Sequence, residues 1–152
     1  MLVQTSVPFP QVSRSRVPAP EREFPRILKK SAGLSVLVVD DEPLVRWAIA
    51  ETLRSREYDV LEAGDADSAL RILMDGQVEP DAVLLDLRLP DCQDLRLLET
   101  LRLMLPDSPV ILMSAFGTPE IAAEARRLGA HAVLDKPFDL DVLPPLLADA
   151  VR

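Results

Sequence analysis

The sequence predicts an α/β fold in which five short parallel strands alternate with helices. Three apolar runs, at residues 34–39, 81–86 and 110–114, are short and rich in Val, Ile and Leu, which is typical of strands buried on both faces. Segments with a helical spacing of apolar residues follow these runs. This alternation predicts βαβ units and one parallel sheet covered by helices on both faces.

The first half of the fold contains two strands and two helices. Residues 34–39 form the first strand, and Pro43 suits the first position of the next helix, where no N–H is needed. Residues 58–63 form a weaker strand that we expect at an edge of the sheet. Asp65 is a favourable N-cap for the helix that follows, and Gly76 closes that helix.

The second half continues the alternation. The strand at residues 81–86 leads to a helix at residues 95–104, which stops before a proline. The strand at residues 110–114 leads to a helix that Pro119 opens and Gly129 ends.

The last helix is expected to begin at Leu140, after a fifth strand at residues 131–135. Pro144 and Pro145 fall inside this helix. An interior proline lacks the N–H that the helix needs, and its ring collides with the preceding turn. We therefore expect a kink or a restart of the helix there.

The connections limit the order of the strands. Right-handed crossovers leave few topologies, and for five strands we predict the flavodoxin-like order 2-1-3-4-5, a doubly wound (βα)5 sheet. Such sheets bind ligands outside the carboxyl ends of their strands. Polar residues stand at these ends in four strands that reach one shared edge: Asp40 and Asp41, Asp86, Ser114 and Lys136.

These side chains favour cation-dependent phosphate chemistry. Three carboxylates in one small site repel one another and bind protons or cations. Because the ligands are hard oxygens, Mg²⁺ is favoured over zinc or copper, with Mn²⁺ as the alternative. Lys136 and Ser114 would supply a positive charge and a hydrogen-bond donor to a phosphate. A carboxylate beside the metal can act as a nucleophile and form an aspartyl phosphate.

The segments that carry these residues resemble the receiver domain of two-component response regulators. In order, they are VLVVDDEPLVRWAI, DAVLLDLRLP, MSAFG and HAVLDKPFD. The resemblance covers residues 34–152, and it is strong because the segments follow one another at the family's spacings. The sequences around Arg46-Trp47, residues 87–90 and residues 115–117 look most like receivers of the nitrogen-regulation, sigma-54-activator type.

The resemblance implies a role for each polar residue. Asp86 would be the phosphoacceptor, phosphorylated by a histidine kinase or a phosphotransfer protein. Lys136 would bind the phosphate, Ser114 would be the switch hydroxyl, and the family has a cis peptide bond at the position of Lys136-Pro137. The implied metal ligands are Asp41 directly, Asp40 mainly through water, Asp86, and the backbone carbonyl of Arg88.

The chain departs from the family pattern at three places. Val133 replaces an aromatic residue that usually rotates inward when the switch hydroxyl engages phosphate, so that coupling is not expected in its usual form. Asp94 replaces a glycine, and Asp tolerates positive φ better than most residues. Pro144-Pro145 lies on the face that the family uses for dimers and partners, made of the helix from Pro119, the strand at residues 131–135 and the last helix. A homodimer, if one forms, is expected to use this face.

Composition excludes several classes of protein. No apolar run approaches the roughly 18 residues of a membrane span, and the N-terminus lacks the basic-then-apolar order of a signal peptide. We therefore expect a cytoplasmic protein that makes no contact with a membrane. The single cysteine, Cys92, excludes an internal disulfide and a cysteine zinc site, and the single histidine, His131, excludes a histidine-rich metal site.

Charge divides the chain near residue 33. Residues 1–33 carry six basic and two acidic side chains, so their charge is +4, and with a total of −8 the remaining residues carry −12. Five of the fourteen prolines also lie in this segment. We predict a disordered, proline-rich, basic extension at residues 1–33 and a receiver domain at residues 34–152. The acidic domain is a poor candidate for direct binding to nucleic acid.

Three functional hypotheses are consistent with these residues. The leading one is a phosphoacceptor signalling switch, which is not an enzyme beyond its own phosphotransfer and autodephosphorylation. The alternative is a phosphorylation-independent interaction module, which Mg²⁺ binding would distinguish. A metal-dependent phosphohydrolase is a minor alternative, because the sequence has no Asp-x-Asp signature after the first strand and no glycine-rich phosphate loop. No output domain is visible, so the chain is either a stand-alone regulator or the receiver part of a longer protein.

Overall fold

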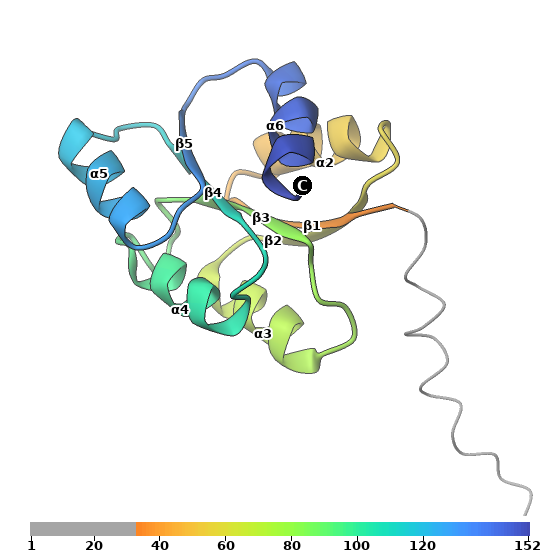
Figure 1. Ribbon diagram of the computed structural model, residues 1–152, viewed down its shortest axis with the longest axis horizontal. Coiled ribbons are helices and arrows are strands. Elements are labelled where there is room, and N and C mark those ends of the chain that lie inside the picture. Colours follow the sequence, from red (N-terminus) through yellow and green to blue (C-terminus); the bar gives the residue numbers. More distant parts are fainter. Residues whose placement is uncertain (1–32) are drawn as a thin grey trace, which may run out of the picture. The chain divides into compact units, whose positions relative to one another are not determined.

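Five parallel strands form one sheet in the order β2-β1-β3-β4-β5, which confirms the predicted topology. The computed structural model describes residues 33–152, and Figure 1 shows the sheet between two groups of helices. The extension predicted at residues 1–33 therefore lies outside the described residues, apart from Gly33. The strands are β1 (Ser35–Val39), β2 (Asp59–Ala63), β3 (Ala82–Asp86), β4 (Val110–Ser114) and β5 (Ala132–Asp135).

The helices pack in two layers. Within residues 33–152 they are α2 (Pro43–Arg54), α3 (Ala66–Asp75), α4 (Arg96–Met104), α5 (Pro119–Arg127) and α6 (Leu143–Ala150). Figure 1 shows α2 and α6 on one side of the sheet and α3 and α4 on the other. Leu37 and Val39 of β1 pack in one apolar cluster with α3, α4 and α5, whereas Val36 and Val38 pack in another with α2 and α6. Successive side chains of a strand point to opposite faces, so one strand supplies both layers. In this described region no helix has the length and apolar character that a membrane span needs.

Burial separates the central strands from the edge strands. Every residue of β1, β3 and β4 is buried, whereas β2 and β5 are partly exposed. The expectation that β2 lies at an edge is thereby confirmed. A strand covered by helices on both faces must be apolar throughout, and each fully buried Leu or Ile contributes about 1.5–3 kcal/mol to the fold.

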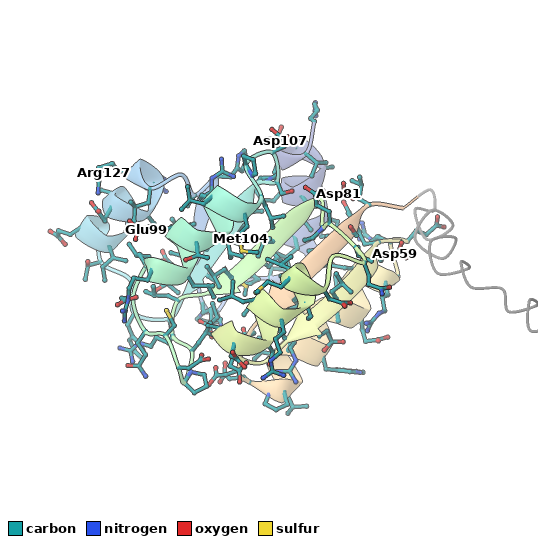
Figure 2. The ribbon with its side chains drawn as sticks, turned by 90° about the horizontal axis from the view of Figure 1, so that it is seen from below. Asp59, Asp81, Glu99, Met104, Asp107 and Arg127 are labelled. Carbon is teal, nitrogen blue, oxygen red and sulfur yellow. The ribbon has the colours of Figure 1, made fainter. Side chains whose placement is uncertain are left out.

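The amino end of the sheet is held by a structural carboxylate. Asp59 begins β2 and Asp81 directly precedes β3, so both lie at this end (Figure 2). Asp81 accepts hydrogen bonds from the backbone N–H and the hydroxyl of Ser35, at 2.8 and 3.2 Å. These bonds join the starts of β1 and β3. Asp40 and Asp86 lie at the other, carboxyl end of the same two strands.

The helix ends follow the predicted signals. Asp65 caps α3 by accepting a hydrogen bond of 2.7 Å from the backbone N–H of Ser68, and Gly76 ends the helix with a φ of 71°. Gly129 follows α5 with a φ of 108°. This positive φ favours glycine, and a Cβ at position 129 would lie 2.8 Å from Nε of Arg102 and would force that side chain to shift.

The last helix restarts, as its prolines predict. A 3-10 turn at Leu140–Val142 precedes α6, which begins only at Leu143 rather than at Leu140. Pro144 and Pro145 thus lie in the first turn of α6, where their missing N–H groups cost no hydrogen bond.

Asp94 does not take over a left-handed glycine conformation. In the described part of the chain Glu57, with a φ of 68°, is the only non-glycine residue with positive φ. Asp94 instead accepts a hydrogen bond of 3.0 Å from the backbone N–H of Arg96 at the start of α4. This bond and the adjacent guanidinium of Arg96 lower the pKa of Asp94. Its side chain is therefore an acceptor at a helix start.

Candidate functional site

Three carboxylates meet at the carboxyl ends of β1 and β3. Asp40 and Asp41 follow β1, Asp86 is the last residue of β3, and the two strands are neighbours in the sheet. One carboxylate oxygen from each residue lies within 4.8 Å of the other two. Asp40 and Asp86 are buried and Asp41 is exposed, so the cluster reaches solvent on the side of Asp41. Such a group of oxygens could hold a hard divalent cation.

Lys136 supplies the positive charge of the site. Its ammonium lies 2.9 Å from Oδ2 of Asp40, 3.4 Å from Oδ2 of Asp86 and 3.6 Å from Oε1 of Glu42. The lysine directly follows β5, and its peptide bond to Pro137 is cis. Three carboxylates surround this ammonium and Asp41 adds a fourth to the site, so the site keeps an excess of negative charge that favours a cation.

The electrostatics of the site raise two pKa values. Burial raises the pKa of Asp86 to about 6, and the neighbouring charge of Asp40 adds to this effect, while Lys136 opposes it. Burial acts to lower the pKa of Lys136. The hydrogen bond to Asp40 and the charges of Asp40 and Asp86 outweigh burial and raise this pKa. Lys136 therefore stays a cation at neutral pH, and the pKa of Asp86, about 6, lies above the range of an ordinary carboxylate.

Ser114 ends β4 beside this cluster and is almost fully buried. Its Oγ has no hydrogen-bond partner among the described residues. A Cβ at Gly117 would lie 2.8 Å from this oxygen, so glycine is needed there to make room for the hydroxyl. A buried hydroxyl without a partner is costly, and a ligand oxygen would satisfy it.

Several residues of the site were not found from the sequence. Glu42 contacts Lys136, and its place in the acidic run after β1 was an available signal. Arg46 donates a hydrogen bond of 2.7 Å to the backbone carbonyl of Asp40. The guanidinium of Arg88 lies 5.2 Å from the ring centroid of Phe116, a cation–π contact between the loops after β3 and β4. Neither contact has a sequence signature.

A groove adjoins the acidic cluster. It has a volume of about 550 Å³ and is lined by α2, by the loop after β4 and by the segment after β5. Phe116 and Phe138 supply apolar surface there, and Glu42 and Lys136 join the groove to the cluster. Large exposed apolar side chains beside a charged site are typical of a surface that contacts another protein.

Comparison with known proteins assigns the chain to a family. The family model of the response regulator receiver domain matches residues 36–148. The chain belongs to this family. Receiver domains work with histidine kinases or phosphotransfer proteins and typically use Mg²⁺, and the acidic cluster of this receiver domain has suitable ligands.

The relatives confirm the predicted type. The receiver domain is 35% identical over 117 residues to the regulatory protein AtoC of Escherichia coli, and 36% identical over 118 residues to the DNA-binding transcriptional regulator NtrC of Proteus hauseri. These matches cover 77% of this chain but only 25% and 24% of the relatives, so the chain spans about a quarter of their length. It is also 31% identical to the sporulation initiation phosphotransferase F of Bacillus subtilis, over 77% of this chain and 90% of that protein.

Solved structures give the same result. The receiver domain of NtrX from Brucella abortus matches with a TM-score of 0.69 and 36% identity, over 76% of this chain and 97% of that one. A CheY-like receiver domain from Methanospirillum hungatei, at 22% identity and a TM-score of 0.74, supports the fold alone.

Proposed function

We propose that this receiver domain is a phosphoacceptor switch of a two-component system and that Asp86 carries the phosphoryl group. The donor is the phosphohistidine of a kinase or of a phosphotransfer protein, which the chain would meet in the cytoplasm. A carboxylate oxygen of Asp86 forms a new bond to phosphorus. The P–N bond of the donor breaks, and its electron pair returns to the imidazole.

One observation carries this proposal: Asp86 is buried between two further carboxylates and an ammonium. A buried carboxylate with unbalanced negative neighbours is costly unless it is used. Its pKa of about 6 leaves Asp86 mainly ionised at neutral pH, as a nucleophile must be. When bound, Mg²⁺ would offset the charges of the carboxylates and of the incoming phosphoryl group.

The other residues have supporting roles in the proposal. Asp41 and Asp86 would hold the metal, with Asp40 acting mainly through water and with the backbone carbonyl of Arg88 as a further ligand. Lys136, whose ammonium is 3.4 Å from Asp86, would neutralise phosphoryl oxygens on the acceptor. The hydroxyl of Ser114 would donate a hydrogen bond to one of these oxygens, which would supply the partner that Oγ does not have among residues 33–152.

A protein donor fits the surface around the site. Leu44 and Trp47 of α2 are 78% and 58% exposed, and Phe116 beside the acidic cluster is 71% exposed. A small phosphodonor needs none of this apolar area, whereas a protein that presents a phosphohistidine would cover it.

The proposal is tested by phosphorylation with acetyl phosphate and Mg²⁺, measured as intact mass. We expect the gain of one phosphoryl group in the parent protein and no gain after chelation of the metal. The Asp86→Asn variant should gain nothing, and the matched control Asp94→Asn, an exposed carboxylate on the next loop, should behave like the parent. A gain that persists in Asp86→Asn would contradict the assignment of the acceptor. No gain in the parent, together with no Mg²⁺ binding, would favour the interaction module.

A further inference from the structure

The first turn of α3 is capped by a residue from a distant loop. A helix leaves its first four N–H groups without partners inside the helix. In α3 the N–H groups of Ala66, Asp67 and Ser68 belong to this set, and each donates to a carboxylate oxygen. Asp65, the residue before the helix, accepts only one of these bonds, from Ser68 N to Oδ1 (2.7 Å). Asp91 accepts the other two, from Ala66 N to Oδ1 (2.9 Å) and from Asp67 N to Oδ2 (3.0 Å).

Asp91 belongs to the loop between β3 and α4, which begins directly after Asp86. Each of its two carboxylate oxygens accepts one backbone N–H of α3. Charge-assisted bonds of this kind are stronger than neutral ones, and a negative charge at a helix N-terminus is also favoured by the helix dipole. The bridge therefore fixes this exposed loop against a helix that is 24 and 25 residues away in the chain.

The same loop is also held by its own backbone. Leu89 and Cys92 exchange two backbone hydrogen bonds, of 3.1 and 3.2 Å, so that Asp91 lies inside a closed turn. At the other end of the loop, Leu87 donates a bond of 2.9 Å to the carbonyl of Met113 in β4. Arg88 lies between these two fixed points. Its backbone position is thus set by β4 on one side and by the turn on the other.

We propose that Asp91 is a positioning residue for the metal site. By tying the Leu89–Cys92 turn to the N-terminus of α3, Asp91 holds the backbone of Arg88, and the carbonyl of Arg88 is a ligand in the proposed function, on which this inference rests. A ligand held in place before binding loses less conformational freedom when the metal binds. Residues that orient a ligand without touching the metal typically change metal affinity by 10–100-fold when they are replaced.

The test compares Mg²⁺ affinity in four forms of the full chain: the parent, Asp91→Ala, Asp91→Asn and Asp65→Ala. Trp47, the only tryptophan of the sequence, lies on the helix that follows the acidic run and is a fluorescence reporter, with calorimetry as a second readout. Asp65→Ala is the matched control, because it removes a cap from the same helix without touching the loop after β3. Amide hydrogen exchange at residues 66, 67, 89 and 92 reports the bridge directly.

We expect Asp91→Ala to weaken Mg²⁺ binding about tenfold and to speed exchange at these four amides. Asp91→Asn keeps one acceptor oxygen and should fall between Asp91→Ala and the parent. Asp65→Ala should lower stability and keep the Mg²⁺ affinity of the parent. If Asp91→Ala does not fold, the comparison of Asp91→Asn with Asp65→Ala gives the same decision.

Three results would overturn the inference. One is an unchanged Mg²⁺ affinity in Asp91→Ala. Another is an equal loss in Asp65→Ala, which would mean that any weakening of α3 has this effect. The last is a loss that disappears at about 1 M salt, where the screening length is about 3 Å, because it would then come from the charge of Asp91 alone. A parent that binds no Mg²⁺ would overturn the proposed function as well, whereas a parent that binds it normally confines the failure to Asp91.

Discussion

The ammonium of Lys136 lies closer to Asp40, at 2.9 Å, than to Asp86, at 3.4 Å. Asp40 follows β1 and Lys136 follows β5, so this partly buried pair reaches across the ends of β3 and β4, which lie between them in the sheet. Because Asp40 is the closer partner, Asp86 receives less compensation for its burial. The pKa of Asp86 accordingly stays high, at about 6.

Removal of the lysine should destabilise the fold. In Lys136→Ala, Asp40 and Asp86 stay buried without their counter-charge, and loss of one partner of a buried pair costs about 3–5 kcal/mol. We expect a loss of about 3 kcal/mol at pH 7 in denaturant unfolding, reduced by added Mg²⁺. The control is Arg54→Ala, whose ion pairs with Glu51 and Glu62 are exposed and should cost less than about 1 kcal/mol. Equal losses in the two variants would contradict the buried pair.

Replacement of Asp86 by a neutral residue should stabilise the metal-free protein. The pKa of Asp86 in the fold is about 6, above its ordinary value of 3.8, so the fold binds this proton more tightly than the unfolded chain does. Protonated Asp86 makes its full contribution to the free energy of unfolding below about pH 4, and this contribution is lost as the pH rises through about 6. Asp86→Asn avoids this loss, and we expect it to gain about 1–2 kcal/mol at pH 7 in the presence of a chelator. The gain should shrink toward pH 4, and a constant gain across this range would contradict the shifted pKa.

Mg²⁺ binding should weaken in mild acid. A proton and a metal compete for Asp86, so the apparent affinity should be nearly constant above pH 7 and should fall below about pH 6. Fluorescence titration of Trp47 at several pH values measures this profile. A midpoint near the ordinary aspartate pKa would mean that Asp86 is not the titrating ligand. The Asp94→Asn variant should reproduce the parent's profile.

Gly117 and Ser114 should behave as a coupled pair. A Cβ at position 117 would lie 2.8 Å from Oγ of Ser114, so Gly117→Ala should cost about 1–3 kcal/mol through overpacking. Ser114→Ala removes a hydroxyl that has no partner in the described structure and should change stability by less than about 0.5 kcal/mol. In the double variant the cost of Gly117→Ala should fall by at least about 0.5 kcal/mol. Additive losses in a thermal unfolding cycle would contradict the close contact.

The fold was largely predictable because its signals are local. The buried central strands are apolar throughout, since helices cover both of their faces, and the edge strand β2 is visibly weaker. Asp65, Gly76 and the paired prolines of α6 act within a few residues of their own position, so their effects on helix ends follow from the chain alone. The start of α6 was misplaced by three residues, because the 3-10 turn at Leu140–Val142 is too short for its period to be distinguished from that of an α-helix.

The sequence predicted which residues form the candidate site, but not all of the contacts between them. The strand order places Asp40, Asp86 and Lys136 at one edge, since the carboxyl ends of parallel strands meet there. Two contacts depend on how loops from different strands approach one another. They are the ion pair of Glu42 with Lys136 and the cation–π contact of Arg88 with Phe116. The replacement of the usual glycine by Asp94 was visible in the sequence, but only the structure shows that Asp94 avoids positive φ and accepts a hydrogen bond from the start of α4.

The sequence by itself determined the order of the elements, the acidic and basic residues at the strand ends, and the membership in the receiver family that those residues indicate. Periodicity, caps and motif spacing are properties of neighbouring residues, so one chain is enough to reveal them. Only the tertiary structure decided that Lys136 pairs more closely with Asp40 than with Asp86, that the hydroxyl of buried Ser114 has no hydrogen-bond partner among the described residues, and that Asp91 caps α3. Each of these depends on distances between atoms far apart in the chain, which packing of the helices on the sheet determines.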